Sequence, residues 1–107
     1  MYMIDIYNMI DLNRIVGFQW DDGNGRKSAD KHAVGQSQAE QIFFNEPLLM
    51  IADSKHSAAE QRVHALGHTD DGRLLHVTFT LRAEGTLIRV ISARDMNRKE
   101  RGHYGKA

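Results

Sequence analysis

The sequence predicts an α+β domain: an N-terminal strand and two helices, then an antiparallel meander of about four strands and a short C-terminal helix. Three observations support this fold class. Residues 61–94 form three runs rich in Val, Ile, Leu, Phe and Thr, and the turn signals at 70–72 and 83–85 separate these runs. Residues 37–40 and 97–100 each have the spacing of a helix-capping box.

Residues 1–17 form an N-terminal extension to the single domain predicted over residues 18–107. Apolar residues alternate loosely with Asp5, Asn8 and Asp11 in this extension. The pattern is compatible with an extra strand, with a helix, or with a segment that packs on a partner. The extension lacks a basic start, so it is a poor secretion signal.

The first elements of the domain follow directly. Residues 18–20 alternate in polarity and predict a short strand. Asp21 or Asp22 then caps a helix across residues 23–32. Gly23 and Gly25 weaken this helix, because each costs up to about 1 kcal/mol in a helix interior.

A second helix is predicted after Ser37, which would pair with Glu40 in a capping box. The helix continues through Phe44 and stops before Pro47, because proline cannot extend it. Residues 48–52 are continuously apolar and predict a buried strand. The polar residues 53–60 predict a loop.

Turn chemistry predicts the register of the first hairpin. If residues 70–72 form a three-residue loop with Gly72 in the left-handed conformation, Thr69 pairs with Arg73. His64 then lies opposite Thr78, and the remaining pairs follow at the same spacing.

A tight turn at residues 83–84 sets the second hairpin, with Phe79 opposite Ile88 and Thr78 opposite Arg89. The two registers sort the side chains onto two faces. The apolar face holds Val63, Ala65, Leu75, Val77, Phe79, Ile88 and Val90, and the polar face holds Arg62, His64, His76, Thr78, Thr80 and Arg89, with Leu66, Leu87 and Ile91 among them. A polar face on an antiparallel sheet also occurs without any function, because such sheets often leave one side in water.

The last predicted element is a short helix that begins at Asn97, which would pair with Glu100 in the capping box. Spacing places Arg98 and Arg101 on one side of this helix.

Composition excludes several classes of protein. The 107 residues include no cysteine, so neither a disulfide scaffold nor a thiolate site exists, and a cytoplasmic location is expected. No apolar run approaches the length needed to cross a bilayer. The net charge is zero, but residues 1–60 hold 5 Lys/Arg against 9 Asp/Glu, whereas residues 61–107 hold 9 against 5. This polarity suits a local anionic ligand, although an ordinary solvated surface would also explain it.

No metal or cofactor is expected. The six histidines lack a compact metal-binding motif. The segment Gly23-Asn24-Gly25 lacks the third glycine of a dinucleotide fingerprint, and no phosphate-binding loop ending in Gly-Lys-Ser/Thr is present.

The cations and imidazoles suit RNA cleavage without a metal. That reaction needs a base for the 2′-hydroxyl proton, an acid for the leaving 5′-oxygen, and cations for the phosphorane charge. Histidine titrates near neutral pH and can fill either proton role, and arginine suits the electrostatic role. The candidate residues are Lys31, His32, Arg62, His64, Arg89, Arg94 and Arg98.

A series of short motifs runs in order along most of the chain. It comprises Phe18-x-Trp20-Asp21, Lys31-His32, Asn45-Glu46-Pro47, Glu60-x-Arg62-x-x-Ala65-Leu66-Gly67, Asp71-Gly72-Arg73-Leu74-Leu75, Arg89-Val90-Ile91-Ser92-Ala93-Arg94 and Arg98-x-Glu100-Arg101-x-x-Tyr104. From Phe18 to Tyr104 the chain thereby resembles the BrnT family, the ribonuclease toxins of type II toxin–antitoxin modules whose partner is the antitoxin BrnA.

The resemblance implies a compact α+β fold similar to RelE-type toxins and metal-independent RNA cleavage that inhibits translation. It implies a helical BrnA-like antitoxin as partner, contact with operator DNA only through that antitoxin, and a dimer as one assembly within the complex. Position by position, the matching polar residues are Lys31, His32, Arg62, Arg89, Arg94, Arg98 and Arg101. We assign catalysis to the first five of these, and nucleic-acid binding to His64, Arg98 and Arg101.

The chain departs from the family pattern in the first helix. Family members usually have Lys where this chain has Asn24, Asn where it has Ser28, and Gly where it has Ala33. If the missing Lys contacts phosphate, the chain would instead be a catalytically weak or inactive binding module with the same fold.

Overall fold

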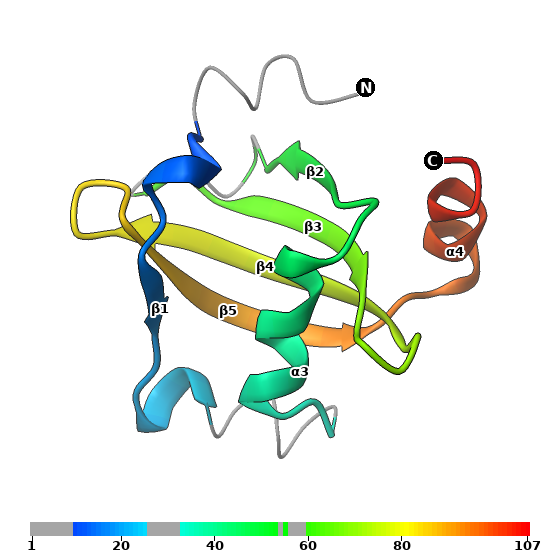
Figure 1. The fold of residues 1–107 in the computed structure, drawn as a ribbon, viewed down its shortest axis with the longest axis horizontal. Coiled ribbons are helices and arrows are strands. Elements are labelled where there is room, and N and C mark those ends of the chain that lie inside the picture. The colour runs from blue at the N-terminus through cyan, green and yellow to red at the C-terminus, as the bar shows by residue number, and fades with distance from the viewer. Residues whose placement is uncertain (1–9, 26–32, 54, 56–59) are drawn as a thin grey trace.

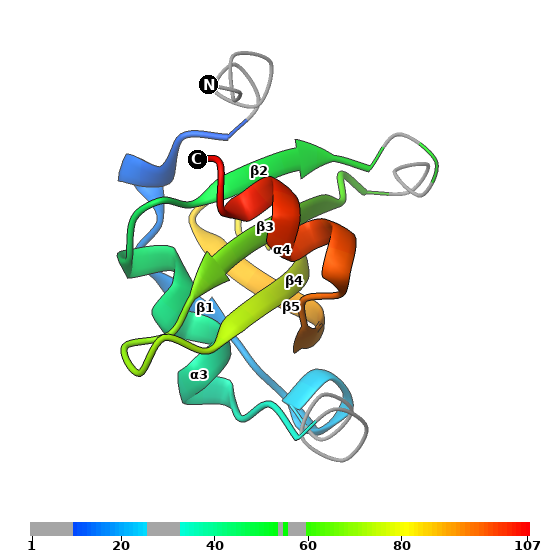
Figure 2. The same ribbon diagram turned by 90° about the vertical axis from the view of Figure 1, so that its right-hand side faces the viewer.

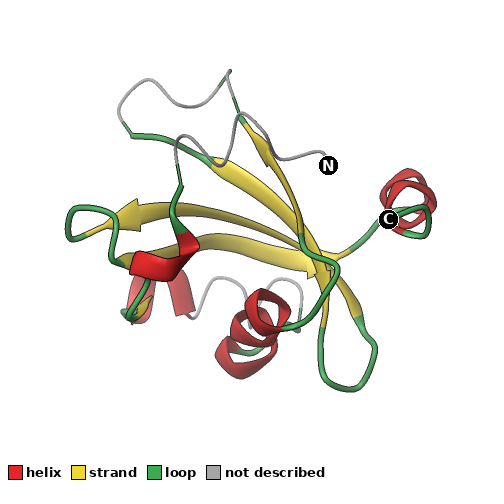
Figure 3. Ribbon diagram, turned by 45° about the horizontal axis from the view of Figure 1, so that its top comes forward, coloured by secondary structure: helices red, strands yellow, loops and turns green. Residues whose placement is uncertain are grey.

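A computed structural model describes residues 10–25, 33–53, 55 and 60–107 of the chain. Its centre is a five-stranded sheet with the strand order β1-β5-β4-β3-β2 (Figure 1). Helix α3 (Gln36–Gln41) packs on one face of the sheet, and helix α4 (Arg98–Tyr104) lies over β3 and β4 on the opposite face (Figures 2 and 3). The predicted α+β class is therefore confirmed.

The sheet is mixed rather than purely antiparallel. Strands β2 (Leu49–Ala52), β3 (Val63–His68), β4 (Leu74–Arg82) and β5 (Leu87–Asp95) pair antiparallel in sequence order. Strand β1 (Gly17–Gln19) begins one residue before the predicted strand and pairs with β5 in parallel. The N-terminal strand thus closes the β5 edge of the meander.

The first hairpin has the predicted register. His64 pairs with Thr78, and Val63 pairs with Phe79. Gly72 has φ +87° at the loop, and the Thr69 amide donates to the Arg73 carbonyl oxygen at 2.9 Å. One glycine in the left-handed region is enough to fix this turn.

The predicted register of the second hairpin is wrong by two residues. Arg82 pairs with Leu87 across a four-residue loop at 83–86, so Phe79 lies opposite Val90 rather than Ile88. The loop is longer than expected because Ala83 and Glu84 both take positive φ values, 52° and 57°, before Gly85.

A β-bulge at Thr78/Phe79 shifts the pairing register of the second hairpin by one further residue. Beyond it Thr78 lies opposite Ser92 rather than Arg89, and His76 lies opposite Arg94. The extra residue in β5 changes which of its side chains reach the polar face. The bulge therefore brings the Arg94 guanidinium to the polar face beside His76.

Helix α3 begins two residues earlier than predicted. Its N-cap is Gly35 rather than Ser37, and the Gly35 amide donates to Gln38 Oε1 at 3.2 Å. The side chain of Gln38 therefore fills the capping role expected of Glu40. A 3-10 turn, η2 (Ile42–Phe44), continues the helix and ends before Pro47, as predicted.

Strand β2 is an edge strand, which corrects the prediction of a buried strand at 48–52. It has β3 on one side only. The Ile51 side chain is therefore open to solvent, with 66% of the residue exposed, whereas Met50 points into the core.

Asp21 is the cap of the first helix. Its Oδ1 accepts from the amides of Gly23 at 2.9 Å and Asn24 at 3.2 Å, and residues 22–25 are helical. The rest of that predicted helix, with Lys31 and His32, lies outside the described residues.

Helix α4 begins as predicted. The Glu100 amide donates to Asn97 Oδ1 at 2.8 Å, and the Asn97 amide donates to Glu100 Oε1 at 2.9 Å, which completes a capping box. At the other end of the helix, the Tyr104 hydroxyl donates to the Pro47 carbonyl oxygen at 2.6 Å. These contacts and the ion pair of Glu100 described below hold α4 over the polar face.

The core lies between the sheet and the α3–η2 segment. Phe79 is fully buried, and the Phe43 ring meets it edge to face with 5.1 Å between centroids. Gly67 permits the close approach of η2, because a Cβ at that position would lie 2.8 Å from Ile42 Cβ. Of the N-terminal extension, residues 12–14 form the 3-10 turn η1 (Leu12–Arg14), and Ile10 is buried in the core.

The described part of the chain contains no helix with the length and apolar character needed to span a bilayer.

Ala33 has φ 55°, a left-handed conformation that favours glycine. This is the position where the resemblance described above implies Gly. We expect Ala33→Gly to raise the free energy of unfolding by about 0.5 kcal/mol, since the relief of strain exceeds the added entropy of the unfolded chain. Urea unfolding measures the change. The matched control Ala39→Gly in α3 should lower stability by about 1 kcal/mol or more, and equal losses in both variants would contradict this explanation.

Candidate active site

The candidate active site lies on the polar face of the sheet, where α4 crosses it. Two rows of side chains run across the strands there. One row contains Arg94, His76 and Leu66, and the next contains Ser92, Thr78 and His64. The site therefore combines one guanidinium and two imidazoles from three neighbouring strands.

His64 is held by polar partners on both sides of its ring. Its Nδ1 lies 2.9 Å from Thr78 Oγ1, and its Nε2 lies 2.9 Å from Asp53 Oδ2. About a third of the His64 side chain is exposed. The Asp53 carboxylate, the His64 imidazole and the Thr78 hydroxyl form a hydrogen-bonded series that can hold or transfer a proton. The tautomer of His64 determines the direction of the transfer.

His76 lies beside His64, with 5.0 Å between ring centroids. Burial, together with the charges of Arg94 and His64, lowers the pKa of His76 to about 4, although Glu100 opposes this shift. His76 is therefore neutral at pH 7. Its buried Nδ1 has no hydrogen-bond partner among the described residues.

Arg94 and Glu100 form a two-point ion pair above His76. Arg94 Nη1 donates to Glu100 Oε1 at 2.8 Å, and Nη2 donates to Oε2 at 2.9 Å. These hydrogen bonds are the main cause that lowers the pKa of Glu100 to about 2, although burial opposes them. Glu100 Oε2 also lies 3.9 Å from His76 Nε2. Glu100 is thus a stable anion and a poor proton acceptor at neutral pH.

Arg89 points toward the N-terminal strand, away from this cluster. Its Nη1 lies 3.2 Å from Gln19 Oε1 and 2.9 Å from Asp21 Oδ2. The hydrogen bond from Arg89 lowers the pKa of Asp21 below its usual value. Arg89 therefore belongs to a second polar group at the β1 edge of the sheet.

The Asn24 side chain stabilises the polar group at the β1 edge through hydrogen bonds. It is buried, and its Nδ2 donates to the carbonyl oxygens of Gln19 at 3.0 Å and Val90 at 2.9 Å. Its Oδ1 accepts from the Asp21 amide at 2.7 Å. Asn24, the position where the resemblance implies Lys, is therefore a structural amide that ties the first helix to β5.

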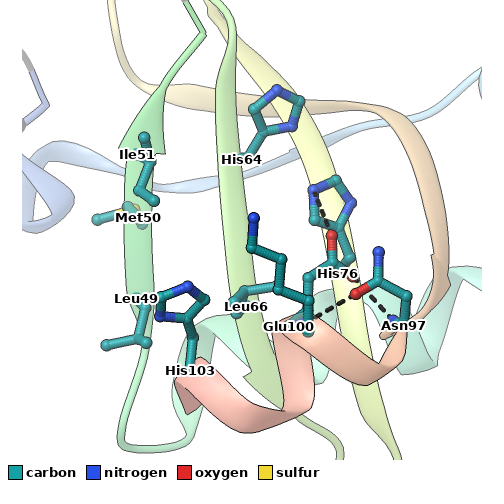
Figure 4. A pocket seen from close by; sticks show the side chains of 10 residues that line it. Leu49, Met50, Ile51, His64, Leu66, His76, Asn97, Glu100 and His103 are labelled. Carbon is teal, nitrogen blue, oxygen red and sulfur yellow. Dashed lines mark hydrogen bonds and ion pairs between the residues drawn. The ribbon is translucent and has the colours of Figure 1, made fainter.

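A pocket of about 520 Å³ opens next to His64 and His76. Its floor comes from β2 and β3, and α4 forms its opposite wall (Figure 4). The residues that line it are Leu49, Met50, Ile51, His64, Leu66, His76, Asn97, Lys99, Glu100 and His103.

The structure brings together only part of the predicted site. His64 and Arg94 flank His76, as described above. Arg62 directly precedes β3 and is half-buried, on the same side of the strand as His64. Arg98 and Arg101 are exposed on α4, and Arg101 Nη1 donates to the Met96 carbonyl oxygen at 2.8 Å.

Sequence reasoning assigned no role in this site to His76, Glu100 or His103. Strand alternation had already placed His76 on the polar face, and its position between His64 and Arg94 follows from the observed registers. The spacing of Glu100 from Asn97 predicts only a capping role. His103 gave no signal beyond its place three residues after Glu100 on the same helix.

Comparison with known proteins identifies the family. The model of the family described as "Ribonuclease toxin, BrnT, of type II toxin-antitoxin system" matches residues 20–100. Among solved structures, the chain is similar to the ribonuclease toxin BrnT of Brucella abortus, with 17% identity and a TM-score of 0.57 over 78% of this chain and 99% of that one. No curated protein matches the chain.

At 17% identity the structural likeness shows a shared fold. The family match is broader evidence, because it spans most of the chain and agrees with the motif series from Phe18 to Tyr104. The chain therefore belongs to the BrnT family of ribonuclease toxins of type II toxin–antitoxin systems.

Proposed function

We propose that this chain is a metal-independent endoribonuclease toxin that acts in the cytoplasm, inhibits translation by cutting RNA, and is neutralised by a BrnA-like antitoxin. The observation that supports it best is the cluster of His64, His76 and Arg94, which supplies two imidazoles and a guanidinium beside an open pocket. Family membership supplies the reaction class.

The proposed reaction is an internal transesterification of RNA. The 2′-oxygen attacks the adjacent phosphorus, the bond from phosphorus to the 5′-oxygen breaks, and the products are a 2′,3′-cyclic phosphate and a 5′-hydroxyl. One group removes the 2′-hydroxyl proton, and another protonates the leaving oxygen. His76 is neutral at pH 7, which is the protonation state that a base needs for the first role, and His64, paired with Asp53, takes the second.

The cations stabilise the negative charge that develops on the phosphorane. Arg94 lies opposite His76 in the sheet and has the main electrostatic role in this proposal. Arg62 and Arg89 bind phosphates that precede or follow the cleaved bond, and Arg98 and Arg101 on α4 bind more distant ones. Lys31 and His32 keep their proposed catalytic roles.

Cleavage in the presence of EDTA tests the proposal. The purified chain, incubated with a structured cellular RNA and excess EDTA, should produce fragments with 2′,3′-cyclic phosphate ends. Within the described residues, no group of three or more His, Asp or Glu side chains is placed to hold a metal ion. Cleavage that begins only after a divalent metal is added would contradict the mechanism.

A second candidate function is a BrnT-fold binding module with weak or absent catalysis that acts in a regulatory complex. Two observations favour it. Arg89 and Arg94 are each engaged by a carboxylate, Asp21 and Glu100, which would compete with phosphate. The family Lys position is occupied by the structural Asn24. A chain that binds its antitoxin and contacts operator DNA through it, yet leaves RNA intact, would identify this function.

A further inference from the structure

The pocket beside the imidazoles has the character of a binding site for a flat ring. Leu49 and Ile51 of β2 and Leu66 of β3 form its apolar floor, and His103 of α4 also lines the pocket (Figure 4). His64 and His76 close one end. Apolar side chains and imidazole planes stack on both faces of an unpaired nucleobase, and such stacking is how proteins hold single-stranded RNA.

The polar groups on the α4 side of the pocket are mainly donors. Asn97 Oδ1 already accepts the Glu100 amide, which leaves the Asn97 side-chain N–H groups for a ligand. Neither these N–H groups nor the Lys99 ammonium is bonded to any residue that the structure describes. Both oxygens of Glu100 accept from Arg94, so the carboxylate is already engaged.

A donor-rich edge discriminates between the two purines. Guanine presents two acceptors, N7 and O6, on one edge, whereas adenine presents the N7 acceptor and an N6 donor there. A Lys or an amide that donates to N7 and O6 would leave the adenine amino group facing another donor. The chemistry of Asn97 and Lys99 therefore favours guanine.

The position of the pocket links the base to the bond that is cut. Arg94 binds Glu100 on the pocket wall, and His64 and His76 line both the pocket and the proposed catalytic cluster. A base held in the pocket places its own phosphate within reach of these groups.

We propose that this pocket binds a guanine base of single-stranded RNA and thereby selects the bond that the toxin cuts, an inference that rests on the ribonuclease function proposed above. Asn97 and Lys99 are its specificity-determining residues. An apolar side chain of an antitoxin is the competing occupant.

Cleavage of matched RNA oligonucleotides tests the proposal. Two oligonucleotides differ only in one unpaired position, guanosine or adenosine, within an otherwise uniform uridine sequence. The parent chain should cut next to guanosine about tenfold faster than next to adenosine. The double variant Asn97→Asp/Lys99→Gln should reduce this ratio to about one. Asp at position 97 keeps the oxygen that caps α4, so the fold is retained.

Lys106→Gln is the matched control for the loss of a lysine charge, because Lys106 lies beyond α4 and outside the pocket lining. It should keep the tenfold ratio. If RNA is cut but the parent shows no preference, or the preference survives in the double variant, the base pocket is wrong and the ribonuclease function stands. A double variant that keeps its preference but escapes neutralisation by the antitoxin would assign the pocket to protein binding and overturn the proposal.

A parent chain that cuts neither oligonucleotide would contradict the ribonuclease function instead. The pocket is then tested by binding of guanosine 5′-monophosphate and adenosine 5′-monophosphate, followed through the NMR signals of the His76 and His103 ring protons. Shifts with the guanosine nucleotide alone would support the base pocket. Equal shifts with both nucleotides, or none, would overturn it.

Discussion

Replacing Arg94 with alanine is expected to lower the rate of RNA cleavage by about 100-fold or more. Arg94 lies opposite His76 in the sheet, and its charge acts on the His76 imidazole. Loss of one well-placed donor to a developing anion typically costs a factor of about 100 to 1,000 in rate. Arg94→Lys should recover little activity, because an ammonium cannot reproduce a two-point contact. Initial rates on a fluorescent RNA oligonucleotide measure both effects.

Arg73→Ala is the control for the loss of a two-point ion pair. Arg73 donates to both oxygens of Asp95, at 2.7 and 3.0 Å, and lies outside the pocket lining. This variant should lose stability but cut RNA at close to the parent rate when it is assayed well below its unfolding temperature. Equal losses of activity in the Arg73 and Arg94 variants would mean that Arg94 acts through stability alone.

Mild acid is expected to destabilise the protein through His76. The pKa of His76 is about 4 in the folded chain, below its usual 6.5, because burial and then Arg94 disfavour the imidazolium. The unfolded chain therefore takes up this proton as the pH falls through 6.5, and the folded chain does so only near pH 4. The free energy of unfolding therefore falls by up to about 3 kcal/mol as the pH is lowered from 6.5 to 4. Urea unfolding at pH 7.5, 6 and 4.5 measures the loss.

His76→Gln isolates this contribution. The variant lacks the titrating imidazole, so its stability should fall less between pH 7.5 and 4.5 than that of the parent. Arg94, Glu100 and His64 all face His76 and remain in the variant. Identical pH dependence in the two proteins would show that His76 is not the group responsible.

The first hairpin was predictable because its local chemistry is unambiguous. Gly72 sets the loop, and alternation over β3 and β4 fixes which residues pair. The second hairpin was not predictable in this way. Ala83 and Glu84 take positive φ values that their side chains do not signal, and the bulge at Thr78/Phe79 has no marker in the sequence.

Long-range contacts explain the remaining differences between the predicted and the observed structure. Strand β1 has three residues, and its parallel partner lies about 70 positions away in β5, so no local pattern reveals the pairing. The sequence predicts the polar face, but it does not reveal which partner each cationic side chain of that face contacts. Arg89 turns to Asp21 at the β1 edge, whereas Arg94 meets His76 only because of the bulge.

Glu100 has two roles, and the sequence predicts only one of them. Its spacing from Asn97 predicted a cap, and the capping box is present. The same carboxylate also binds Arg94, six residues earlier in the chain, which requires the turn between β5 and α4 to fold back. Spacing reveals the first contact, and only the tertiary structure reveals the second.

The pairing of Arg94 with Glu100 also affects the entropy of substrate binding. A free arginine side chain loses up to about 2 kcal/mol of rotamer entropy when a ligand immobilises it. Here the carboxylate has already immobilised the guanidinium during folding, in a side chain about one-third exposed. Much of that entropic penalty is therefore incurred before any RNA arrives, and the arginine is preorganised for contact with a phosphate.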